Sequence, residues 1–148
     1  MKNEILYFTF LILFSCGNQP YELRFDNYED LKETTNPRIK GWFPNIINSD
    51  SYDLRSDSHL NICDFVKFSY SENQSYDSIF LKNPKITVAS FQQKIKENEN
   101  LKPKWFPNSE EINLNDFEIV LADGFDVARK KSTKEIFCIC NPYRFPIR

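Results

Sequence analysis

The tetrapeptide Trp42-Phe43-Pro44-Asn45 occurs again as Trp105-Phe106-Pro107-Asn108, 63 residues further along the chain. The two copies contain both tryptophans of the protein, which makes chance a poor explanation for the recurrence. Each copy follows a segment with helical periodicity and precedes a polar stretch and a pair of strand-like segments. The sequence therefore predicts a tandem pseudo-repeat of helix, aromatic-proline turn and β-hairpin.

One helix is predicted ahead of each aromatic turn. Asp26 can cap the first helix, with Glu29 three residues later in a capping-box pattern, and the helix should stop before Pro37. The second helix is predicted over residues 87–98, where Val88, Phe91 and Ile95 recur at helical spacing. Two polar segments are expected to lack regular structure, namely 17–24, interpreted as a tether, and 71–78, interpreted as a loop.

Alternating apolar residues predict the strands. Residues 51–55 should place Tyr52 and Leu54 on one side, and residues 62–70 should place Ile62, Val66, Phe68 and Tyr70 together. The last third is typical of an antiparallel meander, with strands at 117–121, 125–129 and 135–140 and a turn at Asp123-Gly124. These elements predict an α+β two-layer sandwich, in which two helices cover a mixed, mostly antiparallel sheet in a single domain over residues 25–148.

The N-terminus has the pattern of a bacterial lipoprotein signal peptide over residues 1–15. Ten nearly unbroken apolar residues, 5–14, are too few for a stable membrane span, and they lead into Leu13-Phe14-Ser15-Cys16-Gly17, which resembles a lipobox. Cys16 is therefore the predicted lipidation site, followed by a lipidated tether over residues 16–24. Because Gly17 is uncharged, sorting to the outer membrane is favoured over retention at the inner membrane.

The charge balance argues against a nucleic-acid partner. The formal net charge is -2, and the chain has no basic stripe of the kind that binds phosphate backbones. With only three glycines, the chain cannot build a glycine-rich phosphate loop. The expected contacts are the membrane, through the lipid, and a protein partner; no cofactor is expected.

Three further cysteines lie in the mature chain. An oxidising envelope permits a disulfide between Cys63 and either Cys138 or Cys140, whereas a bridge between the last two would be strained in an extended strand. The alternative is that all three act as small buried hydrophobic residues. A metal site that combines them with His59 lacks the paired spacing of zinc ligands, so no metal is expected.

His59 is the only histidine and therefore the one conventional base for a serine or cysteine nucleophile. It lies in the polar segment 56–59, which is expected to be a solvated turn. Glu110, Glu111, Asp123 and Asp126 could supply a carboxylate pair, but they are interpreted as a solvated segment and a turn. No residue is assigned a catalytic role.

The repeated turns allow two interpretations. Trp42, Phe43, Trp105 and Phe106 lie beside prolines, as rigid apolar anchors at protein interfaces do, so they form a candidate interaction surface. Alternatively, they fasten the ends of the sheet onto the core. We expect at least one of the two tryptophans to be buried, because the two halves should pack together.

The segments Gly41–Pro44, Ser51–Leu54 and 60–70, with the hairpin at 127–131, resemble the YbbD-like head-domain family of small bacterial lipoproteins. Phe43 stands where that family has an aliphatic residue. The resemblance covers about a third of the mature chain and implies a fold and an anchor, but no activity. The sequence thus predicts a lipid-anchored envelope protein with a non-enzymatic, protein-binding or structural domain. The alternatives are an immunity-type inhibitor of a secreted toxin and a small periplasmic hydrolase that uses His59.

Overall fold

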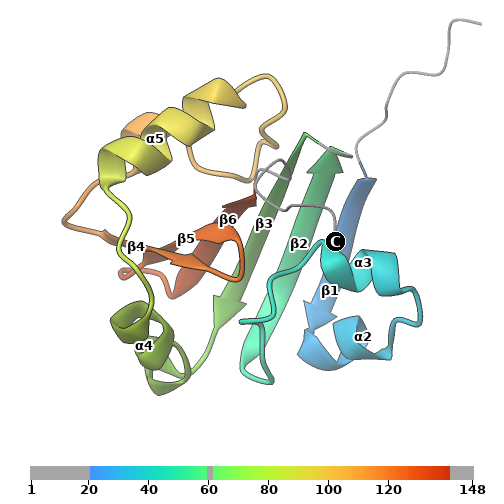
Figure 1. Cartoon of the computed structure of the whole chain (residues 1–148). Coiled ribbons are helices and arrows are strands. Elements are labelled where there is room, and N and C mark those ends of the chain that lie inside the picture. Colours follow the sequence, from blue (N-terminus) through green and yellow to red (C-terminus); the bar gives the residue numbers. More distant parts are fainter. Residues whose placement is uncertain (1–20, 60–61, 141–148) are drawn as a thin grey trace, which may run out of the picture.

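A computed structural model describes residues 21–59 and 62–140. Within these residues, six strands and four helices follow one another (Figure 1), together with one 3-10 turn, η1. In order they are β1 (Tyr21–Asn27), α2 (Tyr28–Glu33), α3 (Pro37–Gly41), β2 (Ser51–His59), β3 (Cys63–Tyr70), α4 (Asn73–Lys82), α5 (Val88–Glu97), η1 (Ser109–Glu111), β4 (Phe117–Ala122), β5 (Phe125–Lys130) and β6 (Glu135–Cys140).

The strands form one sheet in the order β1-β2-β3-β6-β5-β4, and every neighbouring pair is antiparallel. The predicted α+β class is confirmed. The meander predicted over the last third of the chain is also confirmed, since β4, β5 and β6 pair in succession and Ala122 pairs with Phe125 across the Asp123-Gly124 turn.

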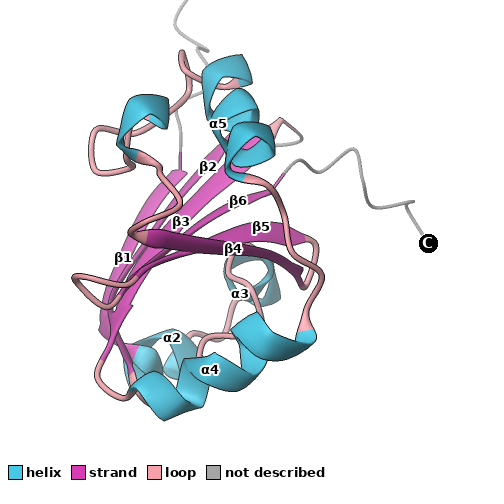
Figure 2. Ribbon diagram, turned by 90° about the vertical axis from the view of Figure 1, so that its left-hand side faces the viewer, coloured by secondary structure: helices cyan, strands magenta, loops and turns pink. Residues whose placement is uncertain are grey.

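Both faces of the sheet are covered, whereas the sequence predicts one covered face and two helices. Helices α2, α3 and α4 lie on one side, called here the α4 face, and α5 lies on the other, the α5 face (Figure 2). The reason is that the central strands carry apolar side chains on both sides. Along β3, Phe65 points to the α5 face and Phe68 to the α4 face, and each is fully buried.

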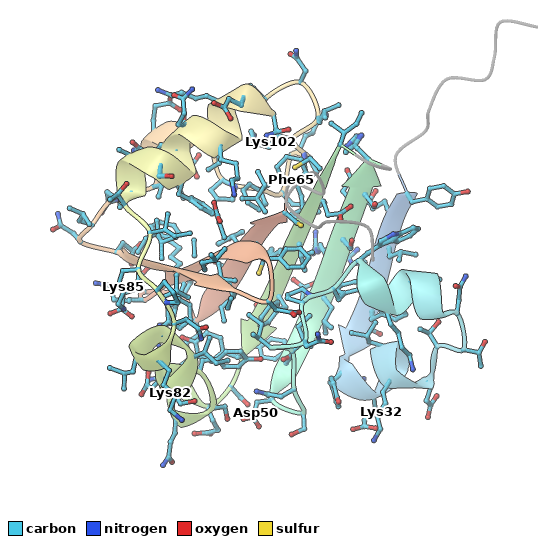
Figure 3. All side chains as sticks on the ribbon, in the orientation of Figure 1. Lys32, Asp50, Phe65, Lys82, Lys85 and Lys102 are labelled. Atoms are coloured by element: carbon cyan, nitrogen blue, oxygen red, sulfur yellow. The ribbon has the colours of Figure 1, made fainter. Side chains whose placement is uncertain are left out.

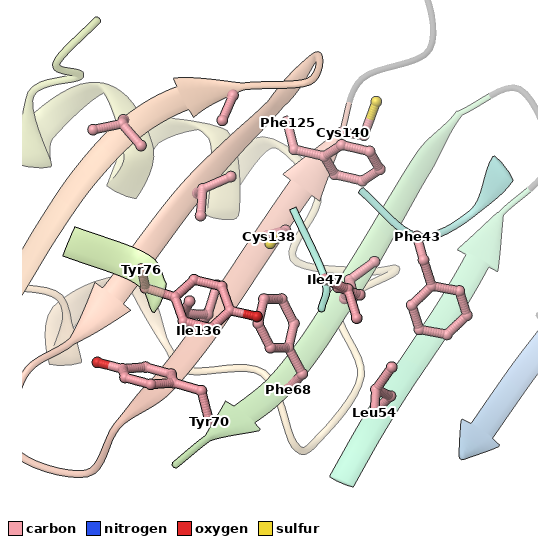
Figure 4. Packing of buried hydrophobic residues seen from close by; sticks show 14 of the residues in the cluster. Phe43, Ile47, Leu54, Phe68, Tyr70, Tyr76, Phe125, Ile136, Cys138 and Cys140 are labelled. Atoms are coloured by element: carbon pink, nitrogen blue, oxygen red, sulfur yellow. The ribbon is translucent and has the colours of Figure 1, made fainter. Parts of the chain in front are cut away.

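Aromatic side chains fill the core of the α4 face (Figure 4). Tyr76 of α4 packs against Tyr70 at 4.7 Å and against Phe68 at 5.7 Å between ring centroids. The Tyr76 hydroxyl is hydrogen-bonded to Ser51 Oγ at 2.6 Å. Helix α4 is therefore fixed to the sheet by both apolar and polar contacts.

The position of α4 corrects one prediction, because residues 71–78 were expected to form a polar loop. Instead the helix begins at Asn73, although the preceding Glu72 makes no capping side-chain hydrogen bond. Tyr76 and Phe80, four residues apart, are both buried against the sheet. Their tertiary burial stabilises a helix that weak local signals would not predict.

The predicted tether also requires correction, since residues 21–24 belong to strand β1. Leu23 and Phe25 point toward the α4-face core and pack partly buried against it. The strand continues to Asn27, whose side-chain oxygen accepts a hydrogen bond from Asp30 N at 3.1 Å. Asn27, and not Asp26, is thus the cap of the first helix. That helix ends before Pro37, as predicted, and Pro37 then starts α3.

A bulge in β2 separates two residues that were predicted to share a face. Leu54 is fully buried, whereas Tyr52 is 46% exposed. The β2–β3 register shifts between Tyr52 and Arg55, and Asp53 adopts a positive φ of 48°. The irregular residue breaks the two-residue alternation of the strand. The next strand also begins one residue later than predicted, leaving Ile62 exposed outside β3.

Helix α5 agrees with its prediction. Thr87 caps the helix by accepting a hydrogen bond from Ser90 N at 3.1 Å. Phe91 and Ile95 are fully buried on the α5 face, and Val88 packs at the edge of the same cluster. Figure 3 places Phe65 inside the molecule and the labelled side chains of Lys32, Lys82 and Lys85 at its periphery.

The predicted pseudo-repeat is visible in the pairing of the sheet. Glu22 pairs with Asp57 at one edge and Lys85 with Val120 at the other, both antiparallel. The same 63-residue spacing that relates the aromatic turns relates Glu22 to Lys85 and Asp57 to Val120. The isolated bridge at Lys85 is therefore the counterpart of strand β1.

The two repeats are related by a half-turn about β6 with a shift of one residue along it, because Asp57 is level with Ile139 and its counterpart Val120 with Cys138. Hairpin β2–β3 corresponds to β4–β5, and the two hairpins lie symmetrically about β6 in the order β2-β3-β6-β5-β4. Such a rotation preserves strand direction and exchanges the two faces of the sheet. For this reason Phe43 packs on the α4 face and Phe106 on the α5 face.

Candidate functional site

The two aromatic turns have the same local structure. In each copy the tryptophan is half-buried, the phenylalanine and proline are buried, and the asparagine is exposed. The Phe43 N–H donates to the Lys40 carbonyl at 3.2 Å, and the Phe106 N–H donates to the Pro103 carbonyl at 3.0 Å. The identical tetrapeptide thus forms the same turn twice.

The phenylalanines fasten the turns to the core. Between ring centroids, Phe43 lies 5.8 Å from Phe25, and Phe106 lies 5.0 Å from Phe65 and 5.7 Å from Phe137. The tryptophans behave differently, because neither Trp42 nor Trp105 is fully buried. The expectation that one tryptophan is buried is therefore wrong, although both indoles pack partly buried at the edges of the two cores.

A groove of about 240 Å³ runs along the second turn. All four residues of that tetrapeptide line it, and Phe117 and Phe137 add apolar surface. Its other lining residues are charged: Lys67, Lys104, Lys130, Glu111 and Glu135. We call this the lysine–aromatic groove. A groove bordered by three lysines and by the half-buried ring of Trp105 suits a segment that carries acidic side chains beside an apolar one.

The charges of the lysine–aromatic groove are only partly balanced within the protein. Lys67 Nζ lies 2.7 Å from a carboxylate oxygen of Glu135 and 5.8 Å from the centre of the Phe137 ring. Burial alone would raise the pKa of Glu135, but hydrogen bonds from Lys67 and Thr133 outweigh it, so this pKa is lowered. Glu135 therefore stays ionised and is occupied with Lys67.

The indole nitrogen of Trp105 is buried without a hydrogen-bond partner. A donor in this state costs free energy unless an acceptor reaches it. The side chain otherwise contacts Phe106, with 6.1 Å between ring centroids. Trp105 thus combines a partly accessible ring with an unsatisfied N–H.

The first turn borders a different cavity, of about 390 Å³, on the α4 face. Two carboxylates line it, Asp64 and Asp123. Asp64 accepts a hydrogen bond from Ser58 Oγ at 2.5 Å, and Asp123 accepts one from Asn45 N at 2.6 Å. Both carboxylates therefore already serve the fold, Asp123 by tying the first turn to the β4–β5 turn.

His59 is not in a solvated turn, as the sequence predicts, but at the end of β2. Its side chain is only 12% exposed, and Nε2 donates to the Leu101 carbonyl oxygen at 3.0 Å. The same nitrogen lies 3.5 Å from Asp57 Oδ1. Burial raises the pKa of Asp57, and His59 offsets part of that rise. The histidine thus links β2 to the segment that follows α5.

The structure brings a thiol beside this histidine, since Cys63 pairs with His59 in the β2–β3 ladder. Cys63 is fully buried, however, and burial raises the pKa of its thiol far above the usual value. A thiol that stays protonated is a poor nucleophile. The arrangement of Asp57, His59 and Cys63 therefore provides hydrogen bonds and packing, with no activated group for hydrolysis.

Asp126 was interpreted as part of a turn, but it is a buried residue of β5 paired with Lys94 of α5. Only 2% of the Asp126 side chain and 10% of the Lys94 side chain are exposed. The second carboxylate oxygen of Asp126 has no hydrogen-bond partner. This ion pair orients α5 on the sheet, and removal of either partner would leave a buried charge.

The cysteines within the described residues are free. Cys63 lies in the core of the α5 face, whereas Cys138 and Cys140 lie in that of the α4 face. None of the disulfides considered for these three residues is formed, because the sheet separates Cys63 from the other two. Burial raises the pKa of Cys140 to about 12. The three residues act as small hydrophobic side chains.

Among residues 21–59 and 62–140, no group of three or more His, Cys, Asp or Glu side chains is placed to hold a metal ion. Cys16 and the signal peptide lie outside the described residues. The lysines of the groove could not be recognised from the sequence, because Lys67, Lys104 and Lys130 lie far apart along the chain.

Comparison of the chain with protein-family models, curated proteins and solved structures gives no significant match. In the part of the chain that the structure describes, every helix is too short or too polar to cross a bilayer.

Proposed function

We propose that the protein is a lipoprotein of the bacterial envelope, anchored through lipid on Cys16. The support comes from the sequence, in which ten apolar residues lead into Leu13-Phe14-Ser15-Cys16-Gly17. Two or three acyl chains anchor a protein almost permanently, whereas one chain alone would be marginal. Gly17 favours the outer membrane, with the folded domain in the periplasm or at the cell surface.

We further propose that the domain binds another protein and catalyses no reaction. The observation that carries this proposal is the lysine–aromatic groove, where Trp105 presents a half-buried ring beside Lys104 and Lys130. Aromatic rings are frequent anchors of binding energy, and complementary charges fix orientation. The partner segment that fits is extended, apolar in part, and acidic.

The resemblance of the first turn to the YbbD-like head-domain family supports the proposed anchor, because many members of that family look like lipoproteins. An immunity-type inhibitor would be one case of the protein binder proposed here. It makes the further prediction that a toxin gene lies beside the gene for this chain. The hydrolase alternative receives no support from His59, whose neighbours are a buried carboxylate and a buried thiol.

The anchor is tested by metabolic labelling. Labelled fatty acid should enter the full-length protein, and Cys16→Ala should abolish labelling and leave unprocessed precursor. Cys140→Ala serves as the matched control, because that cysteine is buried and should not affect labelling. Labelled fatty acid in the Cys16→Ala variant would contradict the proposed anchor.

The binding site is tested by photo-crosslinking in cells. A photoreactive residue at position 104, in the groove, should give an adduct of defined mass. The same residue at position 82, on the exposed face of α4, should not. Lys130→Glu should reduce the adduct, since it opposes an acidic partner. Equal adducts from positions 104 and 82 would refute the groove as the binding site.

A further inference from the structure

Strand β1 presents an open edge. It is the first strand of the sheet, paired with β2 on its inner side, and nothing in residues 21–59 and 62–140 pairs with its outer side. At the opposite edge, the bridge at Lys85 covers part of β4. An exposed seven-residue edge strand is a ready template for another strand.

The side chains of β1 alternate in chemistry. Tyr21, Leu23 and Phe25 lie on the α4 face, and Tyr21 is 55% exposed. Glu22 and Arg24 lie on the opposite face, where the Arg24 side chain is 62% exposed although its Nη2 lies 3.7 Å from Asp53 Oδ1. One side of the strand is therefore apolar and aromatic, and the other carries an acid and a base two residues apart.

We infer that the partner at this edge is a second copy of the chain, paired β1 to β1 in antiparallel fashion about a two-fold axis at Leu23. In this register Leu23 lies opposite the partner subunit's Leu23. Glu22 lies opposite the partner subunit's Arg24, and Tyr21 opposite the partner subunit's Phe25. Each of the latter two contacts occurs twice. Opposite charges and aromatic pairs directly across strands are stabilising.

Other two-fold registers are less complementary. An axis at Glu22 or Arg24 places like charges directly opposite each other, which is destabilising. An axis at Phe25 aligns Arg24 with the partner's Asp26, but it also places Leu23 opposite Asn27. It would further bring Tyr28, where α2 begins, opposite Glu22, so the ladder would be shorter. The axis at Leu23 is the one that matches every described residue from Tyr21 to Phe25.

This pairing would also account for the half-exposed aromatic residues near the edge. Trp42 contacts Tyr21, with 5.5 Å between ring centroids, and Phe25 contacts Phe43. The two-fold axis would join these two pairs across the subunits into one aromatic row. Helix α2 follows the Asn27 end of β1 (Figure 1), so the rotation places the partner's α2 toward the opposite end of the strand pair.

A charge exchange tests the inference with the full-length protein in detergent micelles. Glu22→Arg alone should place arginines opposite each other, and Arg24→Glu alone should place glutamates opposite each other. Each change creates two like-charge pairs and should weaken the dimer by about tenfold. The double variant restores both pairs and should dimerise like the original chain. An equimolar mixture of the two single variants should form heterodimers, since every pair is then complementary.

Sedimentation velocity over a wide range of concentration measures the proportions of monomer and dimer for each variant. Dimers that are insensitive to both single changes, or a chain that stays monomeric throughout, would overturn the inference. Sensitivity to Arg24→Glu without sensitivity to Glu22→Arg would overturn the register, because it indicates an axis at Phe25.

Disulfide trapping provides a second measurement that depends on geometry. In a Cys16→Ala background, Leu23→Cys should give a covalent dimer on mild oxidation, because residues directly opposite have Cα atoms about 4.5–5.5 Å apart. Glu22→Cys is the matched control. The Cα atoms of the two cysteines would then lie about 7–8 Å apart or more, which is beyond the reach of a disulfide. Equal trapping at positions 22 and 23 would contradict the axis at Leu23. Neither variant depends on lipidation, so the outcome is independent of the proposed anchor.

Discussion

His59 and Asp64 are ionisable side chains in largely buried surroundings at one end of the β2–β3 hairpin. His59 donates to the Leu101 carbonyl, and Asp64 accepts from Ser58. Each lies on a different face of the sheet, as shown by their partners in the ladder, Cys63 and Ser58. For these two side chains, hydrogen bonding and burial therefore determine the contribution to the stability of the fold.

Replacing His59 with alanine should destabilise the domain. The change removes the hydrogen bond to Leu101 and leaves the carboxylate of Asp57 without its imidazole neighbour. We expect a loss of about 1–3 kcal/mol in the free energy of unfolding, measured by urea denaturation. Lys82→Ala, at an exposed position, should change it by less than about 0.5 kcal/mol. An equally small effect at His59 would mean that the side chain is solvated.

Asp64 predicts a dependence of stability on pH. Burial raises the pKa of Asp64 above its ordinary value of 3.8, although the Ser58 hydrogen bond opposes the rise. Between the unfolded and folded pKa values the folded state binds more protons, so this group lowers stability as pH rises through that window. Asp64→Asn should therefore stabilise the protein at neutral pH, and the gain should vanish as the pH falls below about 3.8. Urea denaturation at several pH values measures both the gain in stability at neutral pH and its disappearance at low pH. A less stable variant at neutral pH would contradict this assignment.

At the scale of elements, polar contacts connect the short helices to the sheet. Arg129 of β5 donates to Asp77 of α4 at 2.6 Å and to Glu118 of β4. Its guanidinium lies 4.5 Å from the centre of the Phe80 ring. Lys94 and Asp126 perform the same role for α5. Each long helix is thus held by an apolar face and by one charged side chain that crosses to the sheet.

The repeated turns provide a matched pair of substitutions. Phe43→Ala and Phe106→Ala should each cost about 3–5 kcal/mol, because both rings are buried. The cost should be larger for Phe106, whose ring packs against those of Phe65, Phe91 and Phe137. The ring of Phe43 packs against that of Phe25 and borders two cavities, whereas Phe106 borders one. Thermal and urea unfolding measure the difference. The reverse order would show that the ring contacts on the α5 face contribute less than their number indicates.

At the scale of the whole molecule, β6 joins the two repeats. It pairs with β3 of the first repeat and with β5 of the second, and its alternate side chains enter both cores. If either hairpin separated from β6, apolar side chains on both faces of the sheet would become exposed to water. The two repeats should therefore unfold as one cooperative unit.

Single-tryptophan variants test this cooperativity. Trp105→Phe leaves Trp42 as a reporter of the first repeat, and Trp42→Phe leaves Trp105 as a reporter of the second. Within each variant, the urea transition seen by tryptophan fluorescence should superimpose on the one seen by far-UV circular dichroism. Separate transitions would show that the repeats are independent units. Both reporters should also give emission intermediate between buried and exposed indoles, since both rings are half-buried.

Sequence patterns were enough to predict the α+β class, the pseudo-repeat, helix α5 and the meander β4–β6. These features depend on local signals, namely the recurring tetrapeptide, the Thr87 cap with its apolar spacing, and the Asp123-Gly124 turn. Which polar residues are buried depends instead on how the elements pack together. His59 and Asp126 occupy sequences typical of turns, yet packing from Leu101 and Lys94, distant in sequence, encloses them. The bulge at Asp53, the helix α4 and the lysine–aromatic groove arise in the same way. Each depends on packing between different elements, and the free energy of that packing exceeds the local preferences that a sequence pattern reports.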